Sequence, residues 1–275
     1  MTTALRPLST GELLDRTFSL YRSHFGLFVG IFALPYLVVL AFRLVGLVFQ
    51  SQTPQISNIL MNLVWSMWAL FLILIVSAAS QAAAVVAVSN LHLDRPASVM
   101  DSFSTVKGEI PGVIGVSLLV GMASGVAFFA FIVPGVLLLI MWSLAVPSKV
   151  LEHRSATDSM SRSMELTKGS RGRIFVIGLL IFVLSIGVSW LLQWPILIAA
   201  GFSMKTGIQR MAIGWQVAAL VADFVSRSLV GALGTIALSL VYYDQRVRKE
   251  AFDLQLMMST IDASVVPSSP AQVGA

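Results

Sequence analysis

Cysteine is absent from this chain, and charged residues make up only 11% of it. Without cysteine the chain can form neither a disulfide nor a thiolate metal site. The three histidines, His24, His92 and His153, are spread along the sequence and lack the spacing typical of metal ligands. The sequence also has no glycine-rich phosphate loop and no serine-nucleophile motif. These absences exclude the common catalytic constellations, and we expect a non-enzymatic protein with no catalytic residue, no cofactor and no metal.

The residues that take the place of charge are apolar and occur in long runs. Hydrophobic residues make up 57% of the chain, and the mean hydropathy is +0.87. A soluble domain carries about 25% charged residues, whereas a run of about 20 apolar residues spans the hydrocarbon core of a bilayer. The sequence therefore predicts an all-α, polytopic bundle of six transmembrane helices, at about residues 26–49, 60–90, 111–133, 135–151, 173–201 and 224–243.

A short amphipathic segment precedes each pair of apolar runs. Thr17, Ser102 and Ser163 occupy the same relative place in the three segments, and each is followed in register by a cation, Arg22, Lys107 or Lys168. We interpret the pattern as an internal repeat of an amphipathic helix plus a transmembrane hairpin. The units lie at about residues 9–90, 94–151 and 155–250. Together they form one membrane domain over residues 1–258, and we expect the polar tail at 259–275 to be disordered.

Three local signals refine this scheme. Ser9 with Glu12 has the pattern of a capping box, which predicts a helix that starts one residue after Ser9. Pro134-Gly135 is the only break between the third and fourth runs, and this pair is typical of a tight turn. Gly121 and Gly125 form a GxxxG motif, which allows close approach of helices. We expect that motif to serve packing within the chain rather than between two copies.

The formal net charge is +5, and its distribution indicates the orientation. Basic residues gather in the amphipathic segments and after the last run, whereas the opposite loops carry only Lys205 and Arg210. The positive-inside rule therefore predicts that both termini are cytoplasmic. The anionic inner leaflet accounts for the basic balance, so we expect no nucleic acid partner. The residues expected to contact these lipids or a protein partner are Arg16, Arg22, Lys107, Arg162, Lys168, Arg246, Arg248 and Lys249.

The clearest polar feature within the apolar runs is formed by Asp223 and Arg227. They are four residues apart with the acid first, which is the favourable order for an ion pair on a helix. Arg43 in the first run is expected at a similar depth, near the outer boundary, where it could meet Asp223. One interpretation is a polar lining for a solute or a lipid headgroup. The other is a structural pair whose side chains reach the interfacial water.

Four stretches carry a resemblance to a known family. They are LRPLSTGELLDRTFSLYRSHFGLF at residues 5–28, VPGVLLLIMWSLAVPSKVLE at 133–152, SMSRSMELTKG at 159–169 and LVYYDQRVRKEAFDLQ at 240–255. Together they resemble bacterial six-helix proteins of the glycerophosphoryl diester phosphodiesterase membrane-domain type. The resemblance implies a stand-alone six-helix membrane protein of a bacterial plasma membrane. The catalytic barrel that is fused to this domain in some relatives is absent here, so the resemblance does not imply the phosphodiesterase activity.

The sequence favours one function and leaves a second open. Because polarity is concentrated in the short segments while the spans carry little, we expect an accessory, scaffold or partner-binding module at the inner leaflet. The alternative is a transporter, a channel or a lipid-handling protein for a small or lipid-like solute. That function needs polar or interrupted helices near the midplane, for which Gln81, Pro147 and Pro195 are the only indications.

Overall fold

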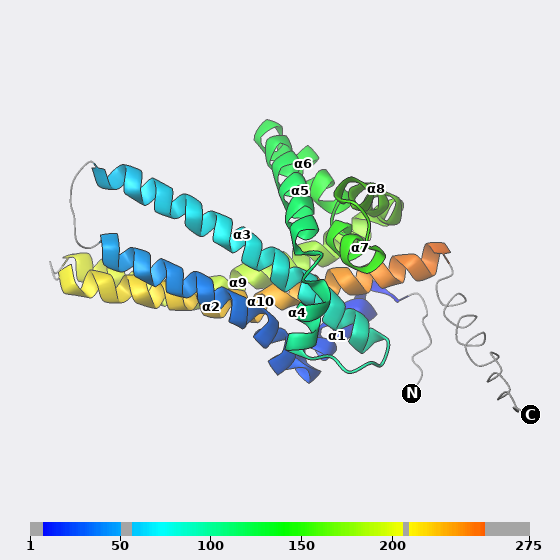
Figure 1. Ribbon diagram of the computed structural model, residues 1–275, viewed down its shortest axis with the longest axis horizontal. Helices are drawn as coiled ribbons and strands as arrows, with labels where there is room; N and C mark the ends of the chain where they lie inside the picture. Colours follow the sequence, from blue (N-terminus) through cyan, green and yellow to red (C-terminus); the bar gives the residue numbers. More distant parts are fainter. Residues whose placement is uncertain (1–7, 51–56, 206–208, 251–275) are drawn as a thin grey trace, which may run out of the picture.

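The computed structural model describes residues 8–50, 57–205 and 209–250, and over these residues the chain is helical with no strand (Figure 1). Six segments are long and apolar enough to cross a membrane, which confirms the all-α, multi-pass prediction. The helices, in chain order, are α1 (Thr10–Ser23), α2 (Phe25–Gln50), α3 (Ser57–His92), α4 (Val99–Val106), α5 (Ile110–Ala130), α6 (Ile132–Met141), α7 (Ala145–Glu152), α8 (Ala156–Thr167), α9 (Arg171–Lys205) and α10 (Gln209–Glu250).

The short helices α1, α4 and α8 each begin at a serine cap. The Ser9 hydroxyl accepts a hydrogen bond from the Glu12 backbone N–H, and the Glu12 carboxylate accepts one from the Ser9 N–H, which confirms the predicted capping box. Ser98 and Ser155 start α4 and α8 in a similar way, each with an aspartate three residues later. Thr17, Ser102 and Ser163, the shared column of the three segments, are all buried. The three-unit repeat itself stays a prediction.

The long helices form two arms (Figure 1). In the first arm α10 packs against α9 and α2, and α2 packs against α3. In the second arm α5 packs against α6, and Figure 1 shows this pair rising away from the other four. The arms meet where α1, α7 and α8 pack against α10 and where α4 packs against α3, and we call the region of these four short helices the polar end (Figure 1).

The buried core lies in the half of the first arm next to the polar end. In α3 the run from Ala82 to Val88 is buried without interruption, and it packs with Phe28 and Ile31 of α2 and with Ile236 of α10. The other half of α3 is different, because Leu60, Met61 and other large apolar side chains are exposed there. Lipid tails are as apolar as these side chains, so in a bilayer they can stay exposed to lipid at no cost in hydrophobic free energy. The helices of the first arm therefore bury α3 against protein only near the polar end.

The turn between α5 and α6 lies three residues before the predicted site. Phe131 has extended backbone angles and separates the two helices, whereas Pro134 and Gly135 lie within the first turns of α6. Proline is tolerated at the start of a helix because the backbone N–H groups there have no partner in the helix. Gly135 serves close packing, since a Cβ atom there would lie 2.4 Å from the Phe128 ring.

The fourth apolar segment is interrupted. The predicted helix at 135–151 is replaced by α6 and α7, which are joined by a turn at residues 142–144. The Ser163 hydroxyl of α8 donates to the Met141 carbonyl at 2.8 Å and accepts from the Leu144 N–H at 3.1 Å. These bonds satisfy backbone groups that the interruption leaves free. The sequence could not show this, because the partner of the turn lies in another helix.

The last two long helices extend further than predicted. α9 continues to Lys205 and α10 begins at Gln209, whereas the predicted runs ended at residue 201 and began at residue 224. The 42 residues of α10 extend over about 63 Å, which is about twice the thickness of a bilayer core. The predicted tail at 259–275 and residues 51–56 lie outside the described residues.

The glycines divide into those that helix packing requires and those that it does not. A Cβ atom at Gly231 of α10 would lie 2.6 Å from the buried Phe32 ring of α2. At Gly121 and Gly125 a Cβ atom would meet nothing within 4 Å, and both residues are exposed. The expectation that this GxxxG motif packs within the chain is therefore wrong for the part of the chain that the structure describes.

Two alanine substitutions test this division. Gly231→Ala should lower the free energy of unfolding by about 1–3 kcal/mol, because the Phe32 ring must move within a packed core. Gly121→Ala should leave stability unchanged or raise it by up to about 1 kcal/mol, because alanine favours the helix and meets no neighbour. Denaturant unfolding of both variants in mixed micelles measures the difference. Equal losses in the two variants would contradict the packing described here.

Candidate functional site

The first polar cluster joins the start of the chain to its last helix. Asp244 of α10 has a side chain that is 1% exposed, and it accepts a hydrogen bond from the Leu8 N–H at 2.8 Å. The same carboxylate pairs with Arg173 of α9 at 2.6 Å and with Arg248 at 3.0 Å. Both arginines also donate to the Leu8 carbonyl. We call these four residues the Asp244 cluster, and it fixes the segment before α1 against α9 and α10.

The second polar cluster joins α7, α8 and α10. Arg162 of α8 donates from Nε to Glu152 at 3.1 Å and from Nη2 to Glu250. The Tyr242 hydroxyl donates to the same Glu152 oxygen at 2.6 Å. We call Arg162, Glu152, Glu250 and Tyr242 the Arg162 cluster. Burial opposes the charge of Arg162, but the hydrogen bonds to Glu250 and Glu152 prevail and raise its pKa. This guanidinium therefore holds three helices together.

A third set of contacts joins the start of α5 to the end of α7. Glu109 immediately precedes α5, and its carboxylate accepts from the Lys149 ammonium group and lies 2.9 Å from His153 Nδ1. The hydrogen bond from Lys149 is the main cause of a lowered pKa of Glu109, and the contact with His153 acts in the same direction. Glu109 is therefore ionised at neutral pH, and it fastens the second arm to the polar end.

The eight basic residues that were predicted to contact lipids or a partner fall into two groups. Arg162, Arg246, Arg248 and Lys249 are engaged within the chain. Arg246 pairs with Glu250 at 3.0 Å, and Lys249 donates to the backbone carbonyls of Glu165 and Lys168 near the end of α8. The other group comprises Arg16, Arg22, Lys107 and Lys168. Their side chains form no ion pair with a described residue, and the exposed members are Arg22, Lys107 and Lys168.

These three residues, which we call the exposed cations, have equivalent positions. Arg22 lies in the last turn of α1, and Lys107 and Lys168 directly follow α4 and α8. Each is therefore at the carboxyl end of one short helix, where a cation is favoured by the helix dipole. Their side chains remain available to a ligand, whereas the clusters described above hold α1 and α8 in place and α4 packs against α3.

At the opposite end of the first arm the structure brings Arg43, Asp223 and Arg227 together. Arg43 Nη1 lies 3.0 Å from Asp223 Oδ2, and Arg227 Nε contacts both carboxylate oxygens at 2.9 and 3.0 Å. The Arg227 guanidinium also lies over the Tyr36 ring, 5.9 Å from its centroid. The predicted meeting of α2 and α10 at this depth is thus present, while a functional role for these residues stays a prediction.

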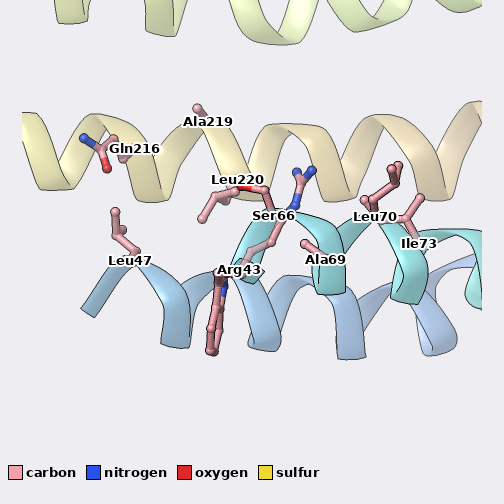
Figure 2. Close-up of a pocket in the computed structure, with 10 residues that line it drawn as sticks. Arg43, Leu47, Ser66, Ala69, Leu70, Ile73, Gln216, Ala219 and Leu220 are labelled. Atoms are coloured by element: carbon pink, nitrogen blue, oxygen red, sulfur yellow. The ribbon is translucent and has the colours of Figure 1, made fainter. Parts of the chain in front are cut away.

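A cavity of about 620 Å³ lies beside this group, between α2, α3 and α10. Figure 2 shows Arg43 and Leu47 from α2, Gln216, Ala219 and Leu220 from α10, and side chains of α3 between them. Trp65 also lines the cavity, and its ring stacks on Phe42 with the centroids 4.3 Å apart. We call this space the Arg43 pocket.

The arrangement of these groups is suited to binding. Within the described ranges, no group of three or more histidine, aspartate or glutamate side chains could hold a metal ion. Three carboxylates of the polar end, those of Asp244, Glu152 and Glu250, are engaged by cations in ion pairs. The two candidate binding features are the exposed cations and the amphipathic lining of the Arg43 pocket.

Sequence reasoning missed most of the polar end. Asp244 and Glu152 were not among the predicted site residues, yet both side chains are largely buried. One usable signal was present, because Arg248 follows Asp244 by four residues, the same order as in the predicted pair of Asp223 and Arg227. Arg173 and Leu8 had no such signal, since they approach Asp244 only through the tertiary fold.

The described parts of the four stretches that carry the family resemblance all reach the polar end. The stretch at 5–28 supplies Leu8, the stretch at 133–152 supplies Glu152, the stretch at 159–169 supplies Arg162, and the stretch at 240–255 supplies Asp244. No known protein family, curated protein or solved structure matches the chain. The geometry of the polar end and of the pocket is therefore the basis for a proposed function.

Proposed function

We propose that this chain is a non-enzymatic scaffold of a bacterial plasma membrane that holds a protein partner at the inner leaflet. One observation carries the proposal: the short helices α1, α4 and α8 pack at the polar end, and each presents an exposed cation at its carboxyl end. The positive-inside rule supports a cytoplasmic location for this end and for both termini. The resemblance to stand-alone membrane-domain proteins of the phosphodiesterase type supports a bacterial membrane.

Preorganisation distinguishes this surface from an ordinary basic flank of a membrane helix. A flexible basic segment loses conformational freedom when it binds. Here the clusters around Asp244 and Arg162 already hold α1 and α8 against α10. A partner with an acidic surface would meet charges at fixed positions, which favours specific docking over diffuse attraction. Anionic headgroups of the inner leaflet occupy the same cations in the absence of the partner.

The test reverses only the exposed cations. The triple variant Arg22→Glu, Lys107→Glu, Lys168→Glu should lose a stoichiometric protein partner in affinity purification from mild detergent, while its yield and thermal unfolding stay unchanged. The matched control is Arg22→Lys, Lys107→Arg, Lys168→Arg, which retains each charge and should retain the partner. Arg162 is left intact, because its reversal would disrupt the polar end itself.

Recovery of the same partner with the triple reversal variant would refute the proposal. Loss of anionic phospholipid alone, with no stoichiometric protein bound to the unmodified chain, would also refute it. That second outcome would assign the exposed cations to lipid contact.

A further inference from the structure

The polar side chains of the Arg43 pocket, Arg43, Ser66 and Gln216, lie toward one end of it along the helix axes. Ser66 and Gln216 lie toward the start of α3 and of α10, whereas Leu70 and Ile73 lie one to two turns nearer the polar end. Figure 2 shows Gln216 and the pair of Leu70 and Ile73 at opposite sides of Arg43. The cavity is about 620 Å³, within the range of small-molecule sites. Leu47 lies on the same side as Gln216 (Figure 2), so the lining is mixed at that end and apolar at Leu70 and Ile73.

The charge of the pocket is positive. Arg43 and Arg227 share the single carboxylate of Asp223, which leaves one positive charge uncompensated within this group. The Arg43 side chain is 32% exposed and uses only Nη1 in its contact with Asp223. A guanidinium has five N–H donors in a planar fork, so further donors of Arg43 remain available. They suit a carboxylate or a phosphate.

The depth of Arg43 matches that of a headgroup on the side opposite the polar end. About 27 Å of helix separates Arg43 from Phe25, where α2 begins near the polar end. About 30 Å separates Asp223 from Tyr243 along α10. Because a hydrocarbon core is about 30 Å thick, Arg43 lies at its far boundary. Leu70 and Ile73 are then at the depth of acyl chains.

We propose that the Arg43 pocket binds an anionic amphiphile, a carboxylate or phosphate head with an attached acyl chain. The head pairs with the Arg43 guanidinium beside Ser66 and Gln216, and the chain lies along Leu70 and Ile73 toward the midplane. The charged head is thus placed beside the polar side chains of the pocket, and the acyl chain is placed beside apolar ones. The proposal is independent of the scaffold function, because the pocket and the exposed cations lie at opposite ends of the first arm.

Trp65 provides an internal probe because it lines the pocket. The full chain is titrated in neutral detergent micelles with dibromostearate, with dibromo-phosphatidylglycerol and with dibromo-phosphatidylcholine, and quenching of tryptophan fluorescence is recorded. The signal assigned to the pocket is the part of the quenching that Trp65→Phe removes. Anionic probes should quench this part saturably and the zwitterionic probe should not. Quenching by the fatty acid alone identifies a free amphiphile, and quenching by phosphatidylglycerol alone identifies a membrane lipid.

Variants of the pocket give effects of opposite sign. Arg43→Gln should weaken binding of the anionic probe by at least about tenfold, since it removes hydrogen bonds to a charged group. Asp223→Asn should tighten binding, because the competing carboxylate becomes neutral. Ile73→Phe changes no charge, adds no tryptophan to the pocket and should block the tail, while Lys107→Gln at the polar end should have no effect. Equal quenching by all three probes, or an affinity unchanged by both Arg43→Gln and Ile73→Phe, would overturn the proposal.

Discussion

Asp244→Asn is expected to lower the free energy of unfolding by about 3 kcal/mol, the largest loss among the substitutions considered. Asp244 has a side chain that is 1% exposed and faces two arginines. Removal of one partner from a buried ion pair costs about 3–5 kcal/mol, because the remaining charge is uncompensated. The lower end of this range applies, since Arg248 is 37% exposed and water screens its charge. Unfolding by denaturant in mixed micelles measures the loss.

Hydrogen exchange, as a second readout, shows which part of the structure opens first in the Asp244→Asn variant. The Leu8 N–H and carbonyl are held by the Asp244 cluster, so its loss should release the segment before α1. Hydrogen exchange in α1 should therefore rise before exchange in the buried part of α3 does. Glu165→Gln is the control, because that side chain is 68% exposed and its removal should cost little. Unchanged exchange in α1 would contradict the role given to Asp244.

Arg162→Met is expected to produce the second largest loss, about 2–3 kcal/mol. Arg162 is 14% exposed and lies between Glu152 and Glu250, which are 11% and 23% exposed. Methionine retains much of the length of the side chain but removes the one cation that bridges the two carboxylates, which then keep only their separate, more exposed partners Arg154 and Arg246. Like charges then repel and α8 separates from α10. Denaturant unfolding of this variant, with proteolysis of α8 as the second readout, measures the effect.

Two further variants separate charge from packing at this site. Arg154→Met removes another partner of Glu152, but Arg154 is 44% exposed and should contribute less than about 1 kcal/mol. The double variant Arg162→Met with Glu152→Gln removes one of the two facing carboxylates and should recover part of the stability. If the double variant is less stable than Arg162→Met alone, repulsion between the carboxylates is not the cause of the loss.

The transmembrane architecture could be predicted from the sequence because it depends on local composition. Each long apolar run has few ways to satisfy its backbone in a bilayer other than as a helix. The capping box at Ser9 was equally local, and it is present. The meeting of Arg43 with Asp223 could also be anticipated, because counting residues from the shared ends of two helices places them at one depth.

The remaining errors have a common physical origin in contacts between helices. Pro134-Gly135 has the composition of a turn, but Gly135 lies inside α6 and packs closely against the Phe128 ring of α5. The turn forms at Phe131 instead. The interruption after Met141 is satisfied by Ser163 of another helix. Four of the cations predicted to contact lipids or a partner are instead bonded within the chain, to acids or carbonyls that are distant in sequence or one turn away. Whether such a side chain is free to bind a ligand depends on the tertiary fold. The four are Arg162, Arg246, Arg248 and Lys249.

The bond between Leu8 and Asp244 joins residues 236 positions apart. A ribosome that adds about 5–20 residues per second needs roughly 10–50 s to make the intervening chain. During this interval the segment before α1 lacks the carboxylate that holds it in the folded chain. Completion of α10 therefore supplies the contact that fixes the segment before the first helix, and a chain that stops before Asp244 cannot form it.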